Sequence, residues 1–98
     1  MYNMKTNQEI NMNNNIYVLT TKYVVYNDSF ISLVLHDEEG DWQFLGNEDN
    51  LKEDDALVVS LEEILNHDPS LSSILDLPMG KQATRDSYDS VWTIQDIN

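Results

Sequence analysis

The sequence contains no cysteine. A disulfide framework, a thiolate nucleophile and a cysteine-ligated zinc site are therefore excluded. Because no covalent link holds the chain together, the fold must come from packing, as is usual for proteins of the reducing cytosol. Glycine is also scarce, with three residues in the chain, and none of them belongs to a glycine-rich loop that could bind phosphate.

Long apolar runs are missing as well. No stretch reaches the roughly 18 apolar residues that a membrane-spanning helix needs. Residues 1–15 contain six asparagines, one lysine and no apolar segment of the kind found in a signal peptide. We therefore expect a disordered tail over residues 1–15, a single domain over residues 16–98, and a cytoplasmic protein.

Basic residues are few: 5 lysines and arginines stand against 18 aspartates and glutamates, which gives a formal net charge of −13. Nucleic acids and anionic membranes are bound through lysine and arginine, so direct binding to either is not expected. A negative field does accelerate the encounter with a cationic protein. The composition therefore predicts a partner with a basic protein surface, and the alternative is that the charge serves solubility alone. Neither interpretation fixes the oligomeric state.

What the chain does contain is a series of short apolar segments. Residues 16–19 and 23–26 are β-branched and aromatic, a composition typical of extended chain. Residues 30–36 and 41–45 flank an acidic, turn-forming segment and predict a β-hairpin. The nearly continuous apolar run within residues 30–35 favours a central strand that is covered on both faces.

The second half of the sequence predicts two short helices. Ser60 can cap a helix that begins at Leu61, and Glu63 completes a capping box. Asp68 can cap a second helix, because Pro69 suits the first helical position. Three further segments are predicted to be strands, namely residues 56–59, 81–85 and 91–94. Together these elements predict an α+β fold, in which a mostly antiparallel β-sheet carries two short helices on one face.

Two acidic segments are the candidate partner-binding regions. Their carboxylates lie in polar stretches of the sequence, where such groups stay ionised and solvated. A tryptophan near the C-terminus adds an aromatic anchor of the kind that contributes strongly to protein interfaces. The predicted partner-binding residues are Asp37, Glu38, Glu39, Asp41, Glu48, Asp49, Glu53, Asp54, Asp55 and Trp92.

No constellation for catalysis or metal binding is present in the sequence. His36 stands beside carboxylates but has no second histidine at a metal-ligand spacing. Neither acidic segment matches the ligand register of an EF-hand calcium loop, and no serine lies in a nucleophile-elbow motif. We therefore predict no enzymatic activity, no cofactor and no metal. Trp42 and the single arginine, Arg85, are expected to be structural, with Arg85 paired to a carboxylate.

The order of several residues resembles that of a bacterial protein family. The matching residues are Asp41, Trp42, Gln43, Phe44, Gly46, Ser60, Leu61, Ile64, Asp68, Pro69, Leu71, Leu77, Pro78, Gly80 and Arg85. This order, which extends over residues 30–85, is similar to the domain known as immunity protein 33, grouped with the immunity proteins of polymorphic toxin systems. The resemblance implies a small acidic interaction protein that neutralises a toxin by binding it, and it implies no catalytic residues.

The sequence leaves three functional hypotheses. The first is an immunity-like inhibitor that covers a cationic surface of a toxin or defence protein. The second is a phage-type anti-defence protein that mimics the charge of a nucleic acid, which would require carboxylates spaced like phosphates. The third is a metal-dependent regulator, which would retain an ion on purification.

Overall fold

The computed structural model describes residues 16–97, so the tail expected over residues 1–15 lies outside the described part of the chain. The elements, in chain order, are β1 (Tyr17–Thr21), α1 (Lys22–Asn27), β2 (Leu33–His36), β3 (Trp42–Leu45), the 3-10 helix η1 (Glu53–Asp55), β4 (Ala56–Ser60), α2 (Leu61–His67), the 3-10 helix η2 (Pro69–Ile74), β5 (Lys81–Thr84) and β6 (Thr93–Asp96). Among these residues no helix combines the length and the apolar character needed to cross a bilayer.

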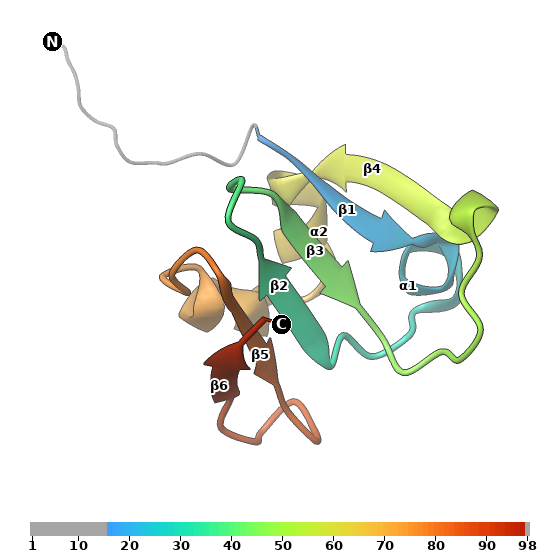
Figure 1. Ribbon diagram of the computed structural model, residues 1–98. Coiled ribbons are helices and arrows are strands. Elements are labelled where there is room, and N and C mark those ends of the chain that lie inside the picture. Colours follow the sequence, from blue (N-terminus) through green and yellow to red (C-terminus); the bar gives the residue numbers. More distant parts are fainter. Residues whose placement is uncertain (1–15, 98) are drawn as a thin grey trace, which may run out of the picture.

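The strands form one mixed sheet of six strands in the order β4-β1-β3-β2-β5-β6. β1 and β3 run parallel, and the other four neighbouring pairs are antiparallel. Figure 1 shows the sheet in front and α2 behind it. α2 and η2 contribute to one buried apolar cluster with the strands, so both helices cover the same face of the sheet. The α+β fold with two short helices on one face is confirmed.

The predicted hairpin is the pair β2 and β3. Their register runs from His36 opposite Trp42 to Leu33 opposite Leu45. Gly40 closes the turn with a φ of 89°, a conformation that glycine adopts without strain. β2 begins three residues later than the apolar run that predicted it.

Residues 23–26 are helical, and the prediction of an extended segment there was wrong. The Thr21 side chain accepts a hydrogen bond from the Val24 backbone N–H and caps α1, and Asp28 ends the helix in the left-handed conformation. Val24 is fully buried in the apolar core. The cap and this burial outweigh the preference of β-branched and aromatic residues for strands, which depends strongly on context.

The two predicted caps in the second half of the chain are both present. Ser60 accepts a hydrogen bond from the Glu63 backbone N–H at 3.0 Å, and Asp68 accepts one from the Ser70 N–H at the same distance. The final strands are also confirmed, although β6 is displaced by two residues toward the C-terminus from its predicted position.

The apolar core lies between the sheet and the helices. Alternate strand residues point into it, among them Val34 and Phe44, and meet Ile64 and Leu71 from the helical side. Leu33 and Leu35 point the other way and are only half-buried. The prediction that the central strand is covered on both faces is therefore wrong, because α2 and η2 both pack on the opposite side.

Arg85 ties the sheet to the second helical segment, as predicted. Its guanidinium forms an ion pair with Asp68 at 2.7 Å, and the two side chains are 1% and 6% exposed. The same group donates hydrogen bonds to the Ile31 carbonyl and to Ser70 Oγ. Three rings enclose it, and Trp92 lies closest, with 4.3 Å between the guanidinium carbon and the ring centroid.

Candidate protein-binding surface

The face of the sheet that points away from α2 and η2 carries no charged side chain on its strands. By the alternation of strand residues, this open face is formed by Val58, Leu19, Gln43, Leu45, Leu33, Leu35, Gln82, Thr84 and their neighbours in the register. This absence of charge contrasts with the net charge of −13 of the whole chain. Figure 1 views the molecule from this side.

An open groove of about 290 Å³ runs over one end of this face. Its exposed apolar lining comes from Tyr17, Leu19 and Val58 on the open face. Val18 and Trp42 also line it, but they point toward the covered face, where Val18 belongs to the core and Trp42 packs against it. Tyr17 and Val58 are 74% and 66% exposed, although both are large apolar residues. Isolated exposed apolar residues are common, but a concave group of them adjoining polar residues is typical of a binding site.

The hairpin turn places carboxylates at the mouth of the groove, where Asp37 and Asp41 join Gln43 as its polar lining. Asp37 Oδ1 accepts hydrogen bonds from the backbone N–H groups of Glu39 and Asp41, at 2.9 and 3.0 Å. These bonds fix the orientation of the Asp37 carboxylate and occupy one of its two oxygens. One oxygen of each of Asp37, Glu39 and Asp41 lies within 4.8 Å of the others.

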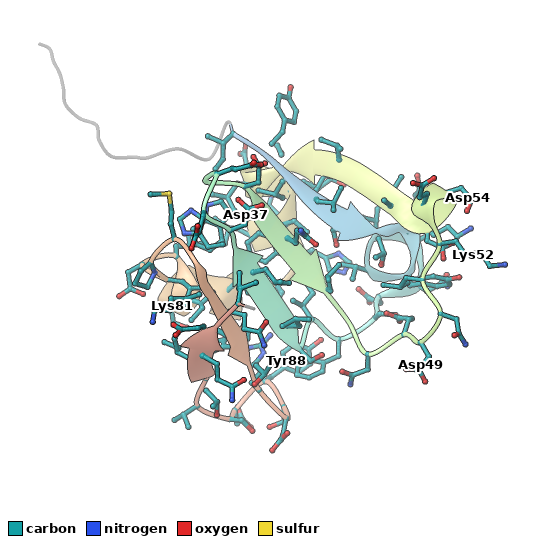
Figure 2. The ribbon with its side chains drawn as sticks, in the orientation of Figure 1. Asp37, Asp49, Lys52, Asp54, Lys81 and Tyr88 are labelled. Atoms are coloured by element: carbon teal, nitrogen blue, oxygen red, sulfur yellow. The ribbon has the colours of Figure 1, made fainter. Side chains whose placement is uncertain are left out.

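No cation of the described residues compensates this charge. Lys22 pairs with Asp55, Lys81 pairs with Asp96, and Arg85 is enclosed with Asp68. Lys52 lies near Asp54, on the other side of the molecule from Asp37 (Figure 2). None of the residues lining the groove is basic. Carboxylates this close together repel one another, so a positive group arriving at the groove is favoured.

The second acidic segment lies at the other end of β3. Because the turn precedes β3 and the loop of residues 46–55 follows it, the structure does not bring the two predicted acidic regions together. Figure 2 shows Asp37 on one side of the molecule and Asp49 and Asp54 on the other. Of the predicted acids, Glu38, Glu39, Asp41, Asp49, Glu53 and Asp54 are exposed.

Glu48 is half-buried and turned toward the protein. Its Oε2 accepts a hydrogen bond from Ser29 Oγ at 2.5 Å. A neighbouring bond joins Ser32 Oγ to Asn47 Oδ1. A side chain at Gly46 would place its Cβ 2.7 Å from Glu48 Oε1, so the absence of a side chain there makes room for this packing. Glu48 thus holds the start of the loop against residues 29–32.

Asp55 is buried, which corrects its prediction as an exposed partner-binding residue. Its carboxylate accepts hydrogen bonds from the Lys52 backbone N–H at 2.9 Å and from the Tyr23 hydroxyl at 3.5 Å. Lys22 Nζ lies 3.1 Å away. The Lys52 N–H bond, followed by the interaction with Lys22, holds the pKa of Asp55 below its usual value, and Asp55 in turn raises the pKa of Lys22.

Trp92 is half-buried beside Arg85 and packs against the core. This location gives it a structural contact, whereas Val91 next to it is 86% exposed. The groove contains neither residue, so the predicted aromatic anchor and the predicted acids belong to different parts of the surface.

Sequence reasoning missed Tyr17, Leu19 and Val58 as surface candidates. All three belong to segments that were correctly predicted to be strands. Their apolar character pointed to burial, and only the pairing of β1 with β4 places them together on the open face. Comparison with protein family models, with curated proteins and with solved structures finds no match. The resemblance to immunity protein 33 therefore stays a prediction.

Proposed function

We propose that this protein is a binding module that inhibits a partner protein with a basic contact surface, in the manner of an immunity protein. The partner class is a cationic toxin or defence protein. The single observation that carries the proposal is the groove, in which an uncharged apolar lining meets the uncompensated carboxylates of Asp37 and Asp41.

The two parts of the groove contribute differently to binding. The carboxylates and the net charge of −13 steer a basic surface toward this end of the sheet, which raises the association rate. The apolar lining loses water on contact and prolongs the lifetime of the complex, because buried apolar and aromatic residues dominate interface energetics. A lysine or arginine of the partner can lay its aliphatic stem along such a lining with its charge at the mouth.

Binding kinetics test this proposal. The partner is captured from the native host on the immobilised protein, and association and dissociation rates are measured at low and moderate salt. We expect salt to slow association much more than it changes dissociation. The double variant Asp37→Asn, Asp41→Asn should associate several-fold more slowly than the wild type at low salt.

A matched control separates the groove from the overall charge. Asp49→Asn with Asp89→Asn removes the same amount of charge from exposed positions, one in the loop that follows β3 and one in the loop between β5 and β6. It should slow association less than the groove variant does, because the charges it removes lie farther from the contact. An association rate that changes neither with salt nor in either double variant would contradict the proposal and would leave solubility as the role of the charge.

A further inference from the structure

Within residues 16–97, β4 forms one edge of the sheet (Figure 1) and lacks the usual features that protect such an edge. It pairs with β1 over its whole length, from Tyr17 opposite Ser60 to Thr21 opposite Ala56, without a bulge. The strand contains no charged residue and no proline. Natural sheets usually block their edges with charges, proline, bulges or a covering element, because an open edge pairs readily with another chain.

The backbone of Val58 is directed toward this open edge. The Leu61 N–H donates to the Ile16 carbonyl at 2.8 Å, which marks that opposing pair as hydrogen-bonded. In an antiparallel ladder, hydrogen-bonded pairs alternate with pairs that point outward. Val59 and Leu57 therefore face β1, and the N–H and C=O of Val58 point away from it.

We infer that β4 accepts an added β-strand, formed by an extended segment of the partner protein in which basic residues flank an apolar centre. The inference rests on the proposed function for the basic character of the partner. Main-chain hydrogen bonds to Val58 hold the added strand, as in other cases of strand addition. An apolar side chain of that strand then lies beside Val58 on the open face, next to the groove.

The charges around β4 select the occupant. Glu53 and Asp54 precede the strand, Glu62 and Glu63 follow it, and all four are exposed. Basic residues at both ends of an added segment would lie near these acids. A second copy of this chain is disfavoured, because antiparallel pairing centred on Val58 would bring Glu53 and Asp54 of one copy toward Glu62 and Glu63 of the other.

The opposite edge of the sheet is less suitable. β6 has four residues and carries a charge, Asp96, which forms an ion pair with Lys81 on the neighbouring strand. An edge charge of this kind hinders pairing with another strand. β4 is longer and uncharged, so it is the edge that is open to an added strand.

The test uses the full chain and a synthetic peptide, Lys-Lys-Thr-Val-Thr-Val-Thr-Lys-Lys, blocked at both ends. Affinity is measured by calorimetry for the wild type and for Val58→Pro, which removes the outward N–H but no bond to β1, a placement that edge strands tolerate. We expect Val58→Pro to bind about tenfold more weakly. Val58→Ala, which keeps the backbone N–H, should lose less affinity for the peptide than Val58→Pro does. A peptide with glutamate in place of every lysine should not bind.

A second measurement does not depend on the folding of a variant. Two versions of the lysine-flanked peptide are prepared, each methylated on every second backbone nitrogen. The first carries the methyl groups on the odd-numbered residues and the second on the even-numbered residues. Strand addition predicts that one set abolishes binding to the wild type and the other does not, because only alternate N–H groups face β4. Equal effects of the two sets, or equal affinity of Val58→Pro and wild type, would overturn the inference while leaving the proposed function standing.

The other possible results of these experiments also support or contradict the inference. Binding that is sensitive to Val58→Pro but does not depend on the charge of the peptide would support strand addition at β4, but it would contradict both the basic character inferred for the added strand and the proposed function. Self-association of the chain that Val58→Pro abolishes, seen by sedimentation, would make a second copy the occupant and overturn the inference. No binding of the lysine peptide at millimolar concentration would overturn it as well.

Discussion

The two faces of the sheet differ in what their side chains contact. The covered face packs Val34, Phe44 and Ala83, all with no exposed surface, against the two helical segments. The open face carries leucines that are half-buried by their neighbours and a valine that is 66% exposed. Neither face has a charged residue directed outward from the central strands, although the open face also carries the polar residues Gln43, Gln82 and Thr84. Among the described residues, only the covered face packs against helical segments.

This difference assigns stability and binding to separate surfaces. The covered face holds the fold together, and its one buried ion pair, Asp68 with Arg85, has hydrogen bonds to satisfy it. The open face contributes less to folding because it stays in contact with water. Substitutions there should change binding with little effect on stability, and substitutions on the covered face should do the reverse.

The largest effect is expected for Arg85→Leu. The substitution leaves the Asp68 carboxylate buried without its cation and removes two further hydrogen bonds. Breaking a buried pair from one side costs about 3–5 kcal/mol. Urea denaturation should show this loss in the free energy of unfolding. The control Lys81→Leu breaks an exposed pair and should cost about 1 kcal/mol or less. Equal losses for the two variants would contradict the structural role of Arg85.

Two alanine substitutions that each truncate an aliphatic side chain, one on each side of the sheet, compare the contributions of the two faces to stability. Ile64→Ala removes a fully buried side chain of α2 and should cost about 2–4 kcal/mol. Val58→Ala removes an exposed side chain on the open face and should cost about 0.5 kcal/mol or less. Denaturant titration of both variants gives the two values. A neutral Ile64→Ala would mean that α2 does not pack on the sheet.

The Asp55 contacts predict a modest dependence of stability on pH. Because folding lowers the pKa of Asp55, the ionised group stabilises the fold above its unfolded pKa of about 3.9. This contribution disappears as the pH falls through the lowered folded value. Asp55→Asn should therefore reduce Tm by at most a few degrees at pH 7, and the difference from wild type should shrink below about pH 4. A Tm difference between wild type and Asp55→Asn that grows as the pH falls would contradict the lowered pKa of Asp55 in the folded protein.

Calcium should produce the smallest effect. The carboxylates of Asp37, Glu39 and Asp41 are close together but lack the ligand register of a calcium loop. We expect millimolar Ca²⁺ to change Tm no more than Na⁺ of equal ionic strength does. A rise of several degrees that is specific to Ca²⁺ would show that the turn is a metal site and would favour the hypothesis of a metal-dependent regulator.

The features that sequence predicted correctly are local. The hairpin of β2 and β3, the Ser60 cap and the Asp68 cap each involve residues close together in the chain. The helix α1 was missed because the β-branched and aromatic composition of residues 23–26 hid the cap at Thr21. The final strands were found because Pro and Gly mark the boundary before β5.

The candidate surface could be predicted only in part, because it depends on the pairing of strands that are far apart in the sequence. β1 pairs with β4, which lies 35 to 43 residues away in the sequence, and this pairing places Tyr17 beside Ser60 and Leu19 beside Val58. No local pattern specifies it. Asp55 was misassigned for a similar reason: Tyr23, which contacts it, belongs to the segment of residues 23–26 that was predicted to be extended, and Lys22 directly precedes that segment. The acids of the turn were found, because a turn exposes its polar residues.

The most direct test of the account is a nuclear magnetic resonance titration of the isotope-labelled protein with the lysine-flanked peptide. Saturable amide shifts are predicted at Leu19, Asp41 and Val58, which surround the groove. Amides of the covered face, such as Ile64 and Ala83, should stay unchanged. Shifts confined to the region around Val91 and Trp92, or to the loop that holds Asp49, would contradict the claim that the open face near the hairpin turn is the binding surface.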